Sequence, residues 1–280
     1  MENTKKPLVS CVCVTRNRVA HLRRVIENFQ HQTYPNKELL ILFESDDNMT
    51  KQLSYLIRAD NIRWHEAPSV PKMSLGNLRN LSIELAAGDY FCQWDDDDWY
   101  HRERIEMQLR CLLESHKCAC ILGYWLMYDA VEEMAYLSHM EAWGGTILCR
   151  KDVFSEVNRY PDQTRHEDTH FIREIVTLKN FAPLIMPSLY IYAFHGRNTF
   201  ERAHFRDLFS MGQALPAHIG ALVKSIFDNK VSYLDACRLL RDKSVLTELD
   251  YFYASSGKGG HNLYGPDNYS GHYHQEIILQ

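Results

Sequence analysis

Short apolar runs rich in β-branched residues alternate with amphipathic segments over the first hundred residues. Residues 8–14 and 38–43 are continuous apolar runs with the length of buried strands. The segment between them carries apolar side chains at helical spacing, including Leu22, Val25 and Phe29. A strand, a helix and a strand of these lengths form a βαβ unit, so we expect parallel strands joined by a right-handed crossover.

The next segment continues the alternation of strand and helix. Residues 61–65 predict a short third strand, and residues 76–87 predict a helix that Gly88 closes as its C-cap. An aromatic, apolar run at 90–94 follows immediately and has the character of a buried strand. The first half of the chain therefore predicts an α/β fold with a mainly parallel sheet flanked by helices.

The pattern changes to helices near residue 200. Long amphipathic segments predict helices over 205–227 and 232–253. The final stretch is rich in Gly, His, Tyr and Asn and has little to bury. We therefore expect three parts: an α/β domain over 1–200, a helical extension over 201–254 and a flexible tail over 255–280.

Four consecutive aspartates, Asp95 to Asp98, directly follow the apolar run at 90–94. Two carboxylates about 4 Å apart repel each other by on the order of 4 kcal/mol at an effective dielectric of 20, so a cation or solvent must screen them. A solvated loop is the ordinary interpretation of an acidic run. The apolar flanks instead favour a buried strand whose acidic end reaches a ligand-binding crevice, where hard carboxylate oxygens suit Mg²⁺ or Mn²⁺.

Composition narrows the functional class. The net charge of −5 over 280 residues does not suggest general nucleic-acid binding. The eight cysteines lack the two-residue gap of zinc sites, which favours reduced core thiols. The start is polar, and no apolar run reaches the roughly 18–20 residues that span a bilayer, so we expect a cytoplasmic protein.

Seven motifs occur in an order that resembles the family 2 glycosyltransferases, which are nucleotide-sugar-dependent enzymes of the GT-A fold. They are residues 9–17, 38–44, 76–80, 87–91, 95–98, 167–168 and 195–199. The resemblance covers about residues 8–200 and implies a Rossmann-like GT-A sheet. It also implies a hexosyl- or N-acetylhexosaminyl-transferase that uses a UDP-sugar or related donor, Mn²⁺ or Mg²⁺, and a glycan or lipid-linked acceptor. Because only one base is identified, we expect single displacement with inversion.

The resemblance assigns the acidic run to the metal and the donor. Asp97 is the leading metal ligand, with Asp98 in support, while Asp95 and Asp96 face the donor. The order of the motifs also makes His195 a metal ligand, although a lone histidine is more often structural or solvated. With four aspartates, the register of the family's Asp-x-Asp is not unique.

The resemblance places the nucleotide after the first two strands. It assigns nucleotide contacts to Thr15, Arg16 and Asn17, where an ordinary turn is the alternative. Glu44 aligns with the acid that contacts the base, and Asp46 is the second candidate.

Three further segments receive roles toward the diphosphate and the sugars. Arg79 is expected to pair with the diphosphate, unless it is an ordinary arginine on a helix surface. Asp168 is the candidate general base, and Glu167 would orient the loop or the acceptor. Alternatively, both acids lie in the first turn of a helix because negative charge there interacts favourably with the helix dipole. The family loop beneath the donor and acceptor sugars corresponds to Trp143, Gly144 and Gly145, for which plain turn chemistry is the alternative.

Residues 217–227 form an amphipathic segment with three placements: docked on the catalytic domain, on a partner subunit in a homodimer, or peripherally at the inner face of a membrane. Docking is the default, because the polar side lacks a dense set of basic residues.

Two other functions remain open. A sugar-phosphate nucleotidyltransferase shares an acidic metal site but usually has a Gly-rich loop after the first strand, which residues 15–18 lack. A binding module without catalysis is the other alternative, and the intact acids argue against it.

Overall fold

The structure, a computed structural model, describes residues 6–156 and 159–255. The chain divides into two compact units, each built from separate stretches. The first contains Met1–Asp98, Glu103–Ile121 and Ala142–Ala182, and the second contains Trp99–Arg102, Leu122–Glu141 and the chain from Pro183. The second unit thus draws on segments well before residue 200, where the sequence pattern put the end of the catalytic domain. Residues 256–280 of the predicted tail lie outside the described residues.

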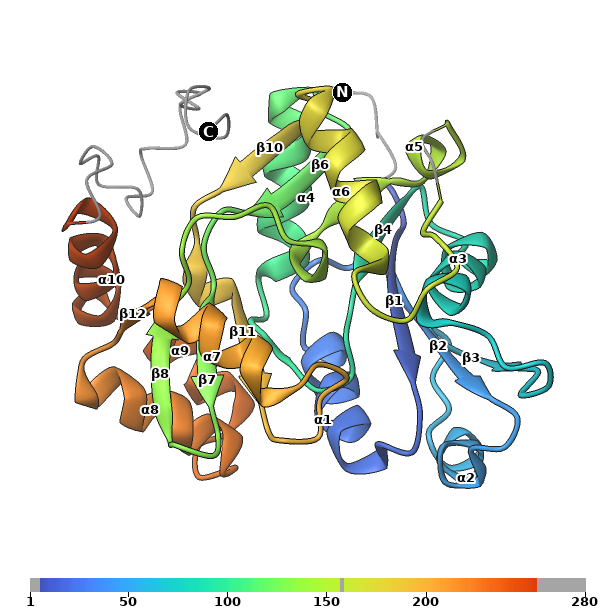
Figure 1. The fold of residues 1–280 in the computed structure, drawn as a ribbon, viewed down its shortest axis with the longest axis horizontal. Coiled ribbons are helices and arrows are strands. Elements are labelled where there is room, and N and C mark those ends of the chain that lie inside the picture. Colours follow the sequence, from blue (N-terminus) through green and yellow to red (C-terminus); the bar gives the residue numbers. More distant parts are fainter. Residues whose placement is uncertain (1–5, 157–158, 256–280) are drawn as a thin grey trace. The chain divides into compact units, whose positions relative to one another are not determined.

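The first unit is an α/β sandwich around a seven-stranded sheet (Figure 1). Its elements in chain order are β1 (Val9–Thr15), α1 (Val19–Gln30), β2 (Lys37–Glu44), α2 (Asn48–Leu56), β3 (Ile62–Ala67), α3 (Leu75–Leu85), β4 (Tyr90–Gln93), α4 (Arg104–Ser115), β6 (Ala119–Leu122), η1 (Gly144–Thr146), β9 (Leu148–Arg150), α5 (Lys151–Glu156), α6 (Glu167–Thr177) and β10 (Phe181–Leu184). The strand order is β10-β6-β9-β4-β1-β2-β3. Strands β4, β1, β2 and β3 run parallel, whereas β9 is antiparallel to its neighbours. The predicted parallel βαβ unit and mainly parallel sheet are confirmed.

The central strands are buried on both faces, which explains their mainly apolar sequences. Every residue of β1 except Val14 is buried, and α3 contacts both β1 and β2. Helix α1 begins after Arg18 and turns Leu22, Val25 and Phe29 inward at the predicted helical spacing. This packing fixes the ends of β1, β2 and β4 at one edge of the sheet.

The prediction that Gly88 caps α3 is wrong. The helix ends at Leu85, and Ala86 is its C-cap with extended backbone (φ −61°, ψ 136°). Gly88 instead lies against the chain entering β1, where an added Cβ would be 2.6 Å from Ser10 Oγ. Its backbone N–H donates to that hydroxyl at 2.8 Å. The glycine is needed for close approach of two segments and not for a left-handed turn.

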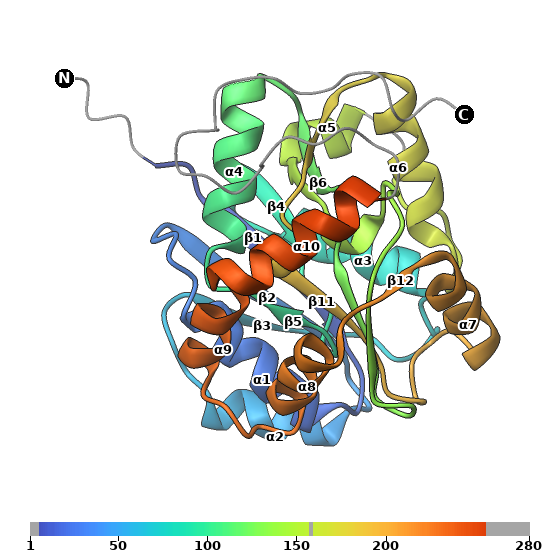
Figure 2. The same ribbon diagram turned by 90° about the vertical axis from the view of Figure 1, so that its left-hand side faces the viewer.

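The second unit combines a five-stranded sheet with helices. Its elements are β5 (Trp99–Tyr100), β7 (Leu126–Asp129), β8 (Met134–Leu137), η2 (Pro187–Leu189), β11 (Tyr190–Phe194), α7 (Arg202–Met211), β12 (Gln213–Ala214), α8 (Ala217–Phe227), α9 (Tyr233–Leu240) and α10 (Lys243–Ser255). The strand order is β12-β8-β7-β11-β5. Helix α9 contacts both α8 and α10 (Figure 2). Ile219, Val223 and Ile226 of α8 are buried in this unit's core with residues of β7 and β11, so its apolar face is docked.

Both long C-terminal helices predicted from the sequence are interrupted. The helix predicted over 205–227 breaks at Gly212, whose backbone is extended, and α8 starts after Pro216 as its N-cap. Between them β12 adds to the sheet beside β8. The helix predicted over 232–253 ends at Leu240, and the carboxylate of Asp242 accepts hydrogen bonds at the start of the next helix. Local polar groups here end helices that the apolar spacing alone would continue.

All eight cysteines are buried and free, as the sequence predicted. No helix within residues 6–156 and 159–255 is long and apolar enough to cross a bilayer.

Candidate functional site

The acidic run lies at the edge of the sheet where β1, β2 and β4 end. The parallel register pairs Val12 with both Leu40 and Gln93, so the residues that follow these strands come together. Thr15, the last residue of β1, donates its hydroxyl hydrogen to Asp96 at 2.6 Å. The structure thus joins one predicted nucleotide-contact residue to the acidic run.

Three of the four aspartates are buried. Asp96, Asp97 and Asp98 are 4%, 7% and 0% exposed, which excludes the solvated-loop interpretation. Arg18 Nη1 lies 3.0 Å from Asp96 Oδ1 and 2.7 Å from Asp97 Oδ2. Burial and the neighbouring Asp97 raise the pKa of Asp96 to about 7, against the opposing effect of Arg18.

The loops after β1 and β2 are tied together by charge. Arg16 pairs with both Glu44 and, at 2.7 Å, Asp46, so the two candidates for the base-contacting acid share one guanidinium. The backbone N–H of Asn17, which has a positive φ of 55°, donates to Asp47 at 2.6 Å. Asp47 also caps α2, so it fixes Asn17 to the start of that helix. Asp47 was not among the predicted site residues.

Arg79 connects the acidic run to the helix that carries the candidate base. It is buried on α3, with Nη2 at 3.1 Å from Asp95 and Nε at 3.2 Å from Glu167. Gln93 also donates to Asp95 at 2.9 Å. The alternative of an exposed helix-surface arginine is therefore wrong. Burial raises the pKa of Glu167, and Arg79 partly offsets that effect.

Asp168 lies against the loop predicted to sit beneath the sugars. A Cβ added to Gly144 would be 2.3 Å from Asp168 Oδ2, so the glycine leaves room for the carboxylate. Burial is the main cause that raises the pKa of Asp168, and Arg79 opposes it. The Trp143 ring packs over Gly145, whose added Cβ would be 2.9 Å from that ring. The two glycines therefore have packing roles that turn chemistry alone does not explain.

A buried arginine, Arg104, supports the loop that contains Trp143, Gly144 and Gly145. Its guanidinium stacks 5.3 Å from the Trp94 ring centroid and donates to the carbonyl of Gly145 at 3.2 Å. Arg104 lies in α4, and in the sequence it resembles an ordinary charged residue on the surface of a helix. Sequence reasoning missed it because only the packing brings it to the loop.

The segment before α6 is fastened to α3. The Asn80 side chain accepts from the backbone N–H of Tyr160 at 3.0 Å and donates to its carbonyl at 2.8 Å. Gly76 N–H donates to Gln163 O at 2.9 Å, and an added Cβ there would be 2.0 Å from Pro161 O. Helix α3 therefore positions both Arg79 and the segment that leads to Asp168.

The buried carboxylates of the acidic run have the chemistry of a divalent-cation site. Asp96 and Asp97 both contact Arg18, and Asp98 is buried next to them, so hard oxygen donors gather at this point. Within residues 6–156 and 159–255, no three His, Cys, Asp or Glu side chains form a metal-binding group. Mg²⁺ is usually bound by one or two carboxylates plus substrate phosphates, so these residues fit a cation that the donor's phosphates help to bind.

Comparison with known families identifies this arrangement. Residues 10–176, more than half of the chain, match the profile described as glycosyl transferase family 2. The chain belongs to this family. The match spans β1 to α6 and therefore includes every predicted site residue except His195.

Individual relatives of this family 2 chain are distant. A Bacillus subtilis (strain 168) glycosyltransferase assigned to teichuronic acid biosynthesis, TuaG, is 25% identical over 122 residues, which cover 44% of this chain and 48% of TuaG. An uncharacterized glycosyltransferase of Haemophilus influenzae is 28% identical over 112 residues, 39% of this chain and 44% of the relative. The matched region spans less than half the length of these curated relatives.

Solved structures share the GT-A fold of this family 2 chain. S. aureus TarS 1–349 in complex with UDP-GlcNAc superposes with a TM-score of 0.53 at 13% identity, over 87% of this chain and 80% of that one. The mannosyltransferase PcManGT from Pyrobaculum calidifontis, in complex with GDP-Man and Mn²⁺, gives 0.54 at 12% identity, over 93% and 78%. The predicted fold class and family are confirmed.

His195, the remaining predicted metal ligand of this family 2 chain, lies in the second unit after β11. Its Nδ1 accepts from the backbone N–H of Arg197 at 3.2 Å, and the backbone N–H of His195 donates to Asn198 Oδ1 at 2.9 Å. A neutral imidazole with an accepting Nδ1 carries its proton on Nε2. Metal binding through Nε2 would therefore require a different tautomer and loss of the Arg197 contact.

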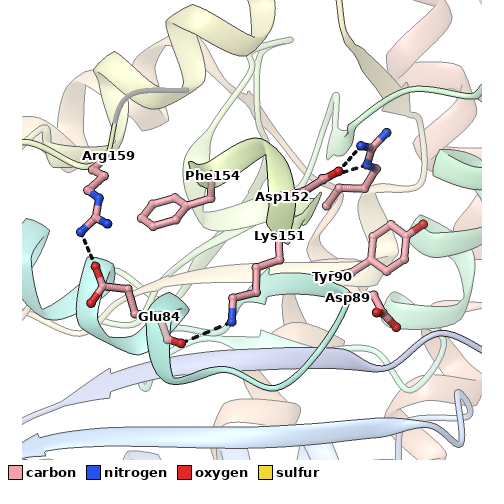
Figure 3. Close-up of a pocket in the computed structure, with 8 residues that line it drawn as sticks. Glu84, Asp89, Tyr90, Lys151, Asp152, Phe154 and Arg159 are labelled. Atoms are coloured by element: carbon pink, nitrogen blue, oxygen red, sulfur yellow. Dashed lines mark hydrogen bonds and ion pairs between the residues drawn. The ribbon is translucent and has the colours of Figure 1, made fainter. Parts of the chain in front are cut away.

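A separate cavity of about 820 Å³ opens at the opposite edge of the first unit's sheet (Figure 3). It lies where β4 begins, whereas the acidic run follows the end of β4. Its charged side chains already have protein partners: Arg150 pairs with Asp152, Arg159 with Glu84, and Lys151 with carbonyls of α3. The lining residues are Glu84, Asp89, Tyr90, Arg150, Lys151, Asp152, Phe154 and Arg159. The cavity is therefore separate from the candidate site.

Proposed function

We propose that this chain is an inverting, metal-dependent glycosyltransferase that moves a hexosyl or N-acetylhexosaminyl group from a UDP-sugar to a hydroxyl of a glycan or lipid-linked acceptor. The observation that carries the proposal is the Arg79 bridge. One buried guanidinium contacts Asp95 of the acidic run and Glu167 beside the candidate base. The side chains proposed to contact the donor and those proposed to contact the acceptor therefore belong to one connected network.

The nucleoside side of the proposal uses the loops after β1 and β2. Arg16 contacts Glu44 and Asp46, the Thr15 hydroxyl donates to Asp96, and the backbone N–H of Asn17 donates to Asp47. These groups suit the ribose and base of a nucleotide, and TarS was solved with both UDP and UDP-GlcNAc. PcManGT was solved with GDP-Man, so a guanosine donor is the alternative that the donor screen must test.

The phosphate side uses the acidic run. Asp97, with Asp98 in support, would hold Mn²⁺ or Mg²⁺, while Asp95 and Asp96 face the donor. When bound, the cation neutralises negative charge on the leaving diphosphate. Arg79 orients Asp95, and its charge also lies close to the expected phosphates.

The acceptor side uses Asp168. Its carboxylate accepts the proton of the attacking hydroxyl, and the raised pKa brings it nearer to the working pH than an ordinary aspartate. Glu167, held by Arg79, orients the acceptor. Trp143 with Gly144 and Gly145 forms a floor on which a sugar ring stacks. A single base with direct attack inverts the anomeric centre.

The first test is a donor screen. Thermal stability with Mn²⁺ is measured against UDP- and GDP-sugars; a ligand at 100 times its Kd stabilises by about 2.7 kcal/mol. Slow hydrolysis of the stabilising donor then supplies an assay that needs no known acceptor. Release of nucleoside diphosphate is expected, and pyrophosphate would instead indicate a nucleotidyltransferase.

The second test separates binding from chemistry. Asp168→Asn is expected to lower turnover by about 10²–10⁴-fold while nucleotide binding is retained. Asp162→Asn, in the exposed loop before α6, is the matched control and should match the wild type. Full turnover in Asp168→Asn would remove the base assignment.

A further inference from the structure

Arg18 forms ion pairs with two of the four aspartates, and none of the roles proposed above uses it. Its Nη1 is 3.0 Å from Asp96 Oδ1 and 2.7 Å from Asp97 Oδ2. The side chains of these aspartates are 6% and 9% exposed, whereas that of Arg18 is 25% exposed. The guanidinium is therefore the most accessible member of the cluster, and it uses an oxygen of the leading metal ligand.

The acidic run has other contacts that do not depend on the Arg18 guanidinium. Thr15 donates to Asp96 at 2.6 Å, through the carboxylate oxygen that the ion pair does not use. Arg24 Nη2 donates to the backbone carbonyl of Asp97 at 2.9 Å. These contacts would hold the loop while the Asp97 carboxylate changed partner.

Arg79 provides an internal contrast. Its side chain is 9% exposed and joins carboxylates from two different elements, so leaving them would break the connection between β4 and α6. Arg18 joins the start of α1 to two consecutive residues of the loop after β4, and it has no side-chain role in capping α1. If Arg18 moved away, Thr15 and Arg24 would still connect that loop to β1 and α1.

A cation bound to Asp97 would lie close to the guanidinium that contacts the same carboxylate. Two positive groups at such a distance repel each other, and the carboxylate has limited capacity to serve both. We propose that Arg18 is an internal competitor of the divalent cation: it neutralises Asp96 and Asp97 until Mn²⁺ or Mg²⁺ binds, and it then leaves Asp97. The inference rests on the proposed metal site and adds a control on cation affinity.

The test is a direct Mn²⁺ titration of the full chain without nucleotide, followed by the EPR signal of free Mn²⁺. Arg18→Met removes the charge but keeps much of the side-chain length, and it is expected to bind Mn²⁺ about tenfold more tightly than the wild type. Arg23→Met is the matched control, because Arg23 is exposed on α1. It should change the affinity by less than about twofold.

A second variant protects the test against misfolding. Arg18→Lys keeps the charge but loses the forked guanidinium geometry, so an intermediate gain in Mn²⁺ affinity is expected. Circular dichroism establishes that each variant is folded. If Arg18→Met does not fold, the Mn²⁺ affinity of Arg18→Lys relative to the wild type tests the proposal.

The outcomes separate this inference from the proposed function. Unchanged or weaker Mn²⁺ binding in the folded Arg18 variants overturns it, and so does the absence of Mn²⁺ binding in every protein. Tighter binding in these variants, combined with no sugar transfer by the wild type on any donor, would support the competitor role. That result would count against the transferase proposal alone.

Discussion

Gly144→Ala would move the candidate base without removing it. The new methyl group would begin 2.3 Å from Asp168 Oδ2 and 2.7 Å from Asp168 Cβ, whereas ordinary contact starts at 3.4 Å. Relief of the oxygen contact therefore requires a displacement of about 1 Å. Gly144 has no positive φ, so an alanine can adopt its backbone and the perturbation falls on the carboxylate.

A misplacement of about 1 Å can lower a rate by about 10²-fold, and we expect that loss in kcat for donor hydrolysis or transfer. Nucleotide affinity should stay within about twofold of the wild type, because Gly144 contacts Asp168, whereas the proposed nucleotide contacts Thr15 and Arg16 interact with other residues. Overpacking is expected to lower the free energy of unfolding by about 1–3 kcal/mol, which urea denaturation measures.

The matched control is Gly220→Ala, the same substitution at a helical position where an added Cβ meets no atom within 4 Å. It should leave kcat unchanged and slightly stabilise α8. Wild-type turnover in a folded Gly144→Ala variant would refute the role of Asp168. A parallel loss of nucleotide binding would show that the loop serves the donor instead.

Three further substitutions, at His101, Asn80 and Gly88, test contacts that stabilise the fold. Burial lowers the pKa of His101 from 6.5 to about 4, so its contribution to stability is fully present above pH 6.5 and is lost as the pH falls toward 4. Urea denaturation of the wild type should therefore show a loss of about 2 kcal/mol by pH 5. The His101→Gln variant can still donate to Cys237 O and should not show this loss. Asn80→Ala removes both hydrogen bonds to the Tyr160 backbone and should destabilise by about 2 kcal/mol; an unchanged urea midpoint would contradict that role. Gly88→Ala places a methyl 2.7 Å from the main chain entering β1, and its melting temperature should fall by several degrees if that contact is rigid.

The α/β core was predictable because its local signals agree. Apolar runs with β-branched residues became β1 and β2, and the helical spacing between them became α1. The C-terminal helices were less predictable, because apolar spacing continues through Gly212 and Asp242 while backbone and side-chain hydrogen bonds end the helices there. Periodicity reports which face is buried and does not report where a helix stops.

The site was predictable where motifs carry charge in a distinctive order. The structure connects Thr15, Arg79 and the Glu167 segment to the acidic run, as that order suggested. Arg18 and Arg104 were missed because Arg18 resembles an ordinary turn residue and Arg104 an ordinary charged residue of a helix. Their contacts involve residues roughly 40 to 80 positions away, which a single sequence does not reveal.

The interleaved second unit limits how this protein can be shortened. Its core joins Leu126 of β7 and Ile191 of β11 to apolar residues of α8 and α9. A truncation after residue 200 would leave those strand residues without their helical cover, and the exposed apolar surface would favour aggregation. Val245 and Leu249 of α10 belong to the same core, so minimal catalytic fragments and chimeras should be cut beyond α10. The last helices should be transplanted together with the strands on which they pack.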